Sequence, residues 1–183
     1  MRIDWKNISI KDLAGLVCGH LKKNGVEATL VGGACVSIYS KNKYVSGDLD
    51  FITYTPTGEL EKVLNALGFA RASRRHFEHP DCEFFIEFPA PPVSIGSEPV
   101  RDFLLLKTKF GSIRILTPTD CVRDRLAAYF FWDDMQSFDQ ALLVARGNDI
   151  NMPAIREWAK REGNREKFRK FRSELKKKQN NKR

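Results

Sequence analysis

The chain lacks the long apolar segments and paired cysteines that mark several large classes of protein. No stretch approaches the roughly 18 to 20 apolar residues that a membrane-spanning helix needs, and the first residues contain no apolar core of a signal peptide. The four cysteines are scattered and form no Cys-x-x-Cys pair, so we expect reduced thiols rather than disulfides. We therefore expect a cytoplasmic protein that does not associate with a membrane.

Several motifs of phosphate binding and nucleophilic catalysis are also absent. The chain has no Gly-x-Gly-x-x-Gly, no Gly-Lys-Ser/Thr and no Gly-x-Ser-x-Gly, which argues against a dinucleotide fold, a P-loop and a hydrolase elbow. His76, His79 and Cys82 recur every third residue, but Pro80 lies among them and no fourth ligand is evident. We assign no metal to these three residues.

What the chain does contain is a sizeable apolar fraction and an uneven charge. With 183 residues, 42% hydrophobic residues and 13 Phe, it is long and apolar enough for one folded domain, or a domain with a small appendage. Residues 160–183 carry 12 Lys or Arg against three Glu, so this tail holds a net charge of +9 and the rest holds −1. Such a segment attracts polyanions, which makes RNA or tRNA a candidate partner. The alternative is a solvated terminal helix.

One stretch combines two adjacent glycines with two alternating carboxylates. The apolar residues 29–31 lead into Gly32 and Gly33, and after a polar loop come Asp48 and Asp50, each followed by a large apolar residue. On a strand, the two carboxylates share one face while the apolar residues anchor the other. Neighbouring carboxylates repel each other unless a cation lies between them, and such oxygen ligands suit Mg²⁺. Because glycines let the backbone approach a phosphate, we expect a site for one or two Mg²⁺ ions and a nucleoside triphosphate. A surface turn without a ligand is the alternative.

This pattern of an apolar residue, Gly-Gly, about a dozen residues and Asp-x-Asp resembles the signature of the DNA-polymerase-β-like nucleotidyltransferases. That superfamily also uses a third carboxylate on a later strand, and Glu87 lies between two large apolar residues as the pattern requires, with Glu in place of the commoner Asp. Glu83, on the same face of the expected strand, is the alternative third carboxylate. The resemblance implies a catalytic and metal-binding set that consists of Asp48, Asp50 and Glu87.

The later part of the chain looks like the AbiEii-type toxin branch of this superfamily. Arg125-Leu126 takes the place of a Lys-Leu pair, and Asp139 is the nearest match to a later Asp of that branch. The resemblance implies that Arg125 lies near the triphosphate, where Arg binds phosphate bidentately and Lys as a point charge. Otherwise Arg125 forms a surface ion pair with Asp133 or Asp139. Ser37, close behind the glycines, is a candidate phosphate donor, although a Ser in a short helix usually faces solvent or its own backbone.

Helix and strand patterns alternate up to residue 117, and only helical patterns follow. Ser9 and Thr117 are expected N-caps. The periodicity predicts helices over 9–24, 34–39, 57–67, 120–132, 137–146 and 153–162, followed by the basic segment. It predicts strands over 26–31, 49–53, 69–73, 82–88, 103–109 and 112–116, the last two as a hairpin. The fold class is therefore α+β, with a nucleotidyltransferase core of mixed sheet flanked by helices (residues 1–117) and a C-terminal helical lobe (118–183).

These observations together predict a Mg²⁺-dependent nucleotidyltransferase that moves an NMP group from an NTP to an acceptor hydroxyl and releases pyrophosphate. The basic tail and the resemblance both favour RNA or tRNA as acceptor, and the toxin branch implies a cognate antitoxin as partner. A protein hydroxyl and a small aminoglycoside-like molecule stay open as acceptors. The alternatives are a non-catalytic nucleic-acid-binding module on the same scaffold and a metal-dependent phosphohydrolase.

Overall fold

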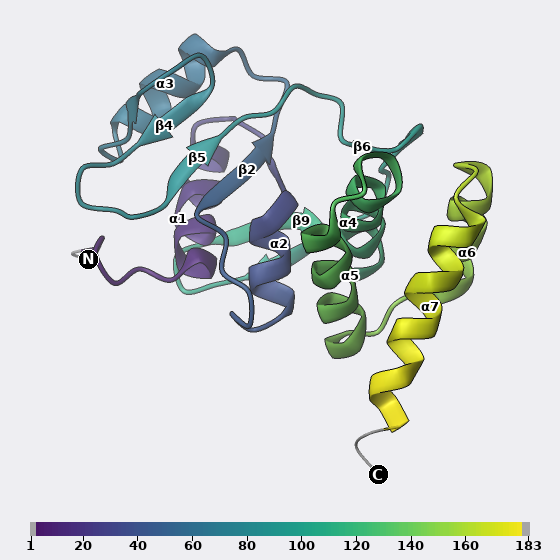
Figure 1. Cartoon of the computed structure of the whole chain (residues 1–183). Helices are drawn as coiled ribbons and strands as arrows, with labels where there is room; N and C mark the ends of the chain where they lie inside the picture. Colours follow the sequence, from purple (N-terminus) through teal and green to yellow (C-terminus); the bar gives the residue numbers. More distant parts are fainter. Residues whose placement is uncertain (1–2, 181–183) are drawn as a thin grey trace.

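The structure is a computed structural model that describes residues 3–180 (Figure 1). The strands of its main sheet are β1 (Thr29–Val31), β2 (Asp48–Ile52), β3 (Ala70–Arg71), β4 (His76–Glu78), β5 (Phe85–Glu87), β8 (Phe103–Lys107) and β9 (Ser112–Leu116). Two further strands, β6 (Ser94–Ile95) and β7 (Glu98–Pro99), form a separate ribbon. The helices are α1 (Ile10–Lys23), α2 (Gly32–Tyr39), α3 (Thr57–Asn65), α4 (Pro118–Trp132), α5 (Met135–Gly147), α6 (Met152–Arg161) and α7 (Arg165–Asn180).

The main sheet is mixed, with the strand order β3-β4-β5-β2-β1-β9-β8. Its central strand β2 runs antiparallel to β1 and parallel to β5. The register places Val31 beside Asp50 on one side and Glu87 beside Asp50 on the other. Leu49 and Phe51, which alternate with the aspartates, are fully buried in the core. The predicted alternation of carboxylate and apolar faces is therefore confirmed.

Capping residues set most helix ends where the sequence predicts them. The side chain of Ser9 accepts a hydrogen bond from the backbone N–H of Asp12, and Thr117 accepts one from Asp120 in the same way. Helices α5 and α6 begin slightly earlier than predicted, because Asp134 and Asn151 act as their N-caps. The predicted hairpin over 103–116 is also present.

The region between α3 and β8 differs most from the prediction. The strands expected over 69–73 and 82–88 are shorter, and β4 lies in what was predicted to be their connection. The backbone N–H of Ala72 donates to the carbonyl of His76 at 2.9 Å, so the chain turns back earlier and pairs β4 with both β3 and β5. The polar composition of residues 73–79 hides this strand, since only Phe77 of β4 is buried.

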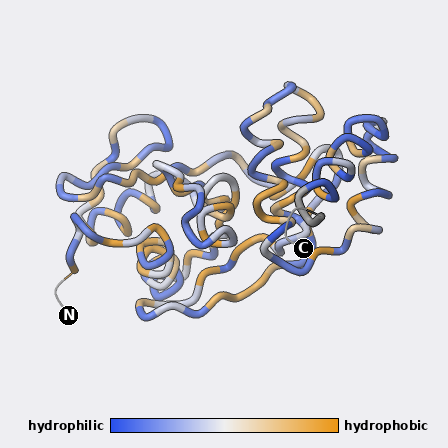
Figure 2. Tube along the Cα trace, turned by 60° about the horizontal axis from the view of Figure 1, so that its bottom comes forward, coloured by the Kyte–Doolittle hydropathy of each residue, from blue (hydrophilic) through white to orange (hydrophobic). Residues whose placement is uncertain are grey.

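Residues 118–180 are helical apart from short connections. Helix α4 packs closely on α5, while α6 and α7 lie on their outer side (Figure 1). Trp158 and Phe171 are fully buried between these helices. The tube of Figure 2 is largely hydrophilic along the outermost helices, and no helix among residues 3–180 is long and apolar enough to cross a membrane. The division into lobes at residues 117 and 118 stays a prediction.

Candidate metal and nucleotide site

Three carboxylates meet on neighbouring strands of the sheet. Asp48 and Asp50 come from β2 and Glu87 from β5, and one carboxylate oxygen of each lies within 4.8 Å of the others. All three side chains are half-buried. Glu83, the alternative third carboxylate, is exposed before the start of β5 and lies outside this group. The donor set consists of hard oxygen ligands only, which fits Mg²⁺.

The electrostatics of the trio disfavour three negative charges. Burial, and then the charges of Asp48 and Glu87, raise the pKa of Asp50 from the usual 3.8 to about 7. The positive charge of Arg125 acts in the opposite direction but does not offset these effects. At pH 7 Asp50 is therefore only partly ionised, and a cation bound beside it would displace the remaining proton. Such a carboxylate is typical of a functional site.

The two glycines permit the close approach of the backbone to these carboxylates. Gly32 has a φ of +69°, and a Cβ atom there would lie 2.4 Å from Oδ2 of Asp50. A Cβ atom on Gly33 would lie 2.6 Å from the hydroxyl oxygen of Ser46. Helix α2 begins at Gly32 after Val31, which has no side chain able to cap it. The first N–H groups of a helix favour anions, so this end of α2 suits a phosphate group beside the carboxylates.

Ser37 supports the site from beneath. Its side chain is fully buried, donates to the carbonyl of Gly33 at 3.2 Å, and accepts from the backbone N–H of Ser46 at 2.9 Å. The hydroxyl of Ser46 in turn donates to Oδ1 of Asp48 at 2.5 Å. Ser37 thus fixes the residue that orients Asp48, and this geometry gives no support to the predicted contact with a phosphate. The sequence pattern did not single out Ser46.

His76 is a second residue that the sequence pattern did not assign to the site. Its Nδ1 lies 3.0 Å from Oε1 of Glu87, its Nε2 lies 2.7 Å from Oε1 of Glu78, and its ring stacks on Phe85. The contact with Glu87 is the largest cause of a raised pKa of His76. His79, which shares the sequence spacing, instead stacks on Trp5. His76 therefore orients the third carboxylate. The sequence did not predict this contact because it depends on the pairing of β4 with β5.

Arg125 is held by its sequence neighbour and acts on the trio by its charge. Its Nε and Nη2 donate to Oδ2 of Asp124 at 3.0 and 2.6 Å, and its Nη1 lies 3.4 Å from the side-chain oxygen of Gln140. Among the described ion pairs Arg125 contacts neither Asp133 nor Asp139, which the sequence suggested as surface partners. The partly buried guanidinium lowers the pKa of Asp50. The contact of Arg125 with a triphosphate stays a prediction.

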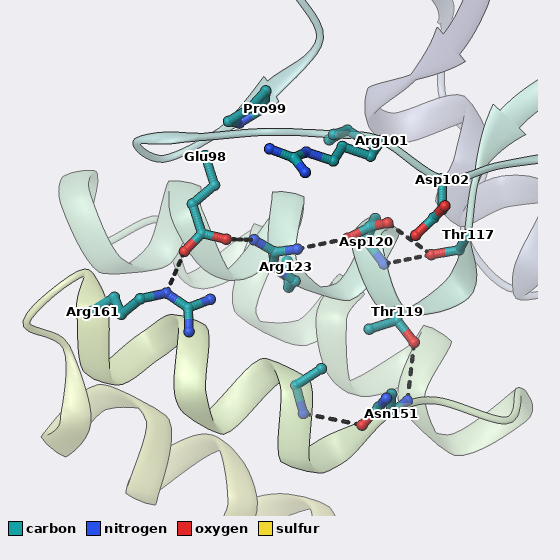
Figure 3. Close-up of a pocket in the computed structure, with 12 residues that line it drawn as sticks. Glu98, Pro99, Arg101, Asp102, Thr117, Thr119, Asp120, Arg123, Asn151 and Arg161 are labelled. Carbon is teal, nitrogen blue, oxygen red and sulfur yellow. Dashed lines mark hydrogen bonds and ion pairs between the residues drawn. The ribbon is translucent and has the colours of Figure 1, made fainter.

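A cavity of about 650 Å³ lies between β7, the start of α4 and α6 (Figure 3). Glu98 crosses it and accepts hydrogen bonds from Arg123 at 2.8 Å and from Arg161 at 2.5 Å. Arg123 also donates to Asp120 at 2.9 Å, so charges of both signs alternate through the cavity. The bond from Arg161 is the main cause of a lowered pKa of Glu98. This network ties the small ribbon to two helices and shares no residue with the carboxylate trio.

No family model and no curated protein sequence matches the chain, but solved structures do, among them two of one protein. The first is the solution structure of the antibiotic-resistance factor ANT(2'')-Ia, with 12% identity and a TM-score of 0.52 over 98% of this chain and 100% of that one. The second is the crystal structure of ANT(2'')-Ia in complex with adenylyl-2''-tobramycin, with 11% identity and a TM-score of 0.50 over 90% and 97%.

At these identities the likeness is one of fold. The predicted α+β fold, a mixed sheet flanked by helices as in a nucleotidyltransferase, is confirmed. The two matched structures are of one antibiotic-resistance factor and not of a toxin, so a closer relationship to the AbiEii-type branch stays a prediction.

Proposed function

We propose that the protein is a Mg²⁺-dependent nucleotidyltransferase that transfers an NMP group from an NTP to an acceptor hydroxyl and releases pyrophosphate. The observation that supports this most is the carboxylate trio, with oxygens within 4.8 Å of one another and a pKa of Asp50 near 7. Its place beside the first N–H groups of α2 adds a position for phosphates.

The residues of the site have separate roles in this proposal. Asp48, Asp50 and Glu87 hold the metal, which when bound neutralises negative charge on the triphosphate. The backbone of Gly32 and Gly33 receives phosphate oxygens. Glu87 also accepts the proton of the attacking hydroxyl, because its half-buried carboxylate lies beside those of Asp48 and Asp50. Supporting contacts come from Ser46 to Asp48 and from His76 to Glu87.

Two classes of acceptor follow from different observations. The complex of ANT(2'')-Ia with adenylyl-2''-tobramycin supports a small aminoglycoside-like acceptor on this fold. The basic segment from residue 160 onward supports RNA or tRNA. A role as a toxin with a cognate antitoxin, in the cytoplasm, rests on the sequence resemblance alone. A non-catalytic nucleic-acid-binding module would keep the basic segment but need no carboxylate trio.

The experiment is a transfer assay with each of the four α-³²P-labelled NTPs and Mg²⁺, using bulk tRNA in one arm and tobramycin in another. The test variant is Asp48→Asn/Asp50→Asn, and the matched control is Glu83→Gln, which removes an exposed carboxylate outside the trio. We expect label on one acceptor with the wild type and the control but not with the test variant. Label on no acceptor, or equal labelling by the test variant, would overturn the proposed function.

A further inference from the structure

The cations of α7 divide into two sets that face different surroundings. Lys167 donates to the carbonyl oxygens of Tyr129 and Phe130 at 3.1 and 2.7 Å, where α4 ends. Lys170 lies over the rings of Tyr129 and Phe138, at 5.7 and 5.6 Å from their centres. These two lysines attach α7 to the helices beneath it, whereas the exposed Arg165, Arg169 and Arg172 of the same helix form no ion pair with the described residues.

A second set of cations lines a groove of about 360 Å³ between α6 and α7. All of these side chains are exposed, and they are Arg156, Lys160, Arg165, Arg169 and Arg172. The groove contains one acid, Glu157, which pairs with Arg156 at 3.4 Å. The other four cations form no ion pair with the described residues. The groove therefore has a net charge of +4 that nothing described in the chain neutralises.

The spacing of these cations suits a chain of negative charges. On each helix they lie three or four residues apart, which places them on one side and separates the Cβ atoms of neighbours by roughly 5–6 Å. Both rows line the same groove, and the two helices that carry them lie next to each other (Figure 1). Several like charges held this close raise the local potential and favour a polyanion over a single small anion.

The apolar residues of α7 argue against a membrane surface. Phe168, Phe171 and Leu175 are all buried against the neighbouring helices. None of the large hydrophobic side chains that are exposed in residues 3–177 lies on α6 or α7. A helix that binds a bilayer needs an apolar face to insert, and this one has no such face available.

We infer that the groove between α6 and α7 binds the phosphate backbone of RNA. The choice of RNA over DNA rests on the proposed function, because RNA offers a 2′-hydroxyl acceptor at every nucleotide. The binding itself needs no catalysis. Each phosphate neutralised on a single strand contributes about 0.7 to the slope of log K against log salt. The four cations without an ion pair therefore give a slope of about −2.8, or a loss of about 50-fold in affinity between 50 and 200 mM salt.

The test measures the fluorescence anisotropy of a labelled 20-nucleotide single-stranded RNA, without NTP and with EDTA, as KCl rises from 50 to 200 mM. The groove variant is Arg165→Gln/Arg169→Gln/Arg172→Gln. The control variant, Lys11→Gln/Lys22→Gln/Lys23→Gln, removes the same charge from exposed positions of α1. Circular dichroism establishes that both are folded. We expect the slope of the groove variant to change to about −0.7, while the control keeps the wild-type slope.

Equal slopes for the two variants would overturn the inference, since net charge alone would then explain binding. Stronger binding of DNA of the same sequence, or of vesicles with anionic lipids, would overturn the choice of RNA. Wild-type RNA binding by the Asp48→Asn/Asp50→Asn variant is expected. If the transfer assay fails while the groove variant still loses RNA binding, the proposed function is wrong and this inference stands.

Discussion

Replacing Asp50 by Asn is expected to stabilise the metal-free protein at alkaline pH. Asp50 lies half-buried between Asp48 and Glu87, and its pKa is raised from 3.8 to about 7. Each pKa unit corresponds to about 1.4 kcal/mol, so ionising this carboxyl in the folded state costs about 4 kcal/mol more than in the unfolded chain. Water that reaches the half-buried group reduces this cost, and we expect a gain of about 2–4 kcal/mol from the uncharged amide.

The sign of the pH dependence follows from where the proton is held. Below about pH 4 Asp50 is protonated in both states and does not affect the free energy of unfolding. Between about pH 4 and 7 the unfolded chain loses this proton while the folded protein keeps it, so the free energy of unfolding falls as pH rises. Above pH 7 the loss is complete. The Asn variant lacks this contribution, and its advantage over wild type grows across the same interval.

The assay is urea unfolding at several values between pH 5 and 8 in EDTA, repeated with Mg²⁺. Asp139→Asn, at an exposed position outside the trio, is the control and is expected to behave as wild type. Saturating Mg²⁺ at 100 times its Kd is expected to add about 2.7 kcal/mol to wild type and less to Asp50→Asn. A constant difference between Asp50→Asn and wild type from pH 5 to 8 would refute the reasoning, because the carboxyl would then ionise equally in both states.

Three further predictions concern the supports of the site and of the fold. Gly32→Ala is expected to lower the free energy of unfolding by more than Gly163→Ala, as measured by urea titration. Both glycines have a positive φ, but only the methyl group added at position 32 meets another group, the side chain of Asp50. His76→Gln is expected to weaken Mg²⁺ binding about 10-fold by freeing Glu87, and unchanged affinity in calorimetry would contradict this. Lys167→Met is expected to lower the midpoint of thermal unfolding through a loss of about 1–2 kcal/mol, since two carbonyls at the end of α4 lose their donor.

The sequence was sufficient for the elements whose signals are local. Ser9 and Thr117 cap their helices as expected, and the hairpin over 103–116 follows from its alternation and central glycine. Asp48 and Asp50 were predictable as a pair because strand alternation alone places them on one face. Glu87 followed from its apolar neighbours, with the resemblance supplying the expectation that it belongs with the pair.

Contacts that depend on strand pairing or on helix packing were not predictable. His76 reaches Glu87 only because β4 pairs antiparallel with β5, and the polar residues around Phe77 give no strand signal. For Arg125 the sequence offered a surface pair with Asp133 or Asp139 as the alternative to a phosphate contact, and these residues lie eight and 14 positions further along the chain. Its true partner is the adjacent Asp124, which a surface-helix spacing rule would not select.

The two parts of the motif, the glycines before α2 and the aspartates of β2, depend on each other physically. The oxygen of Asp50 lies where a side chain on Gly32 would begin, so a carboxylate in that place demands glycine at the start of α2. The same crowding removes water from Asp50 and, with the charges of Asp48 and Glu87, raises its pKa. A chain selected only for stability would replace this aspartate, since an uncharged residue relieves the repulsion. A bound cation and an anionic ligand would offset that cost in this site.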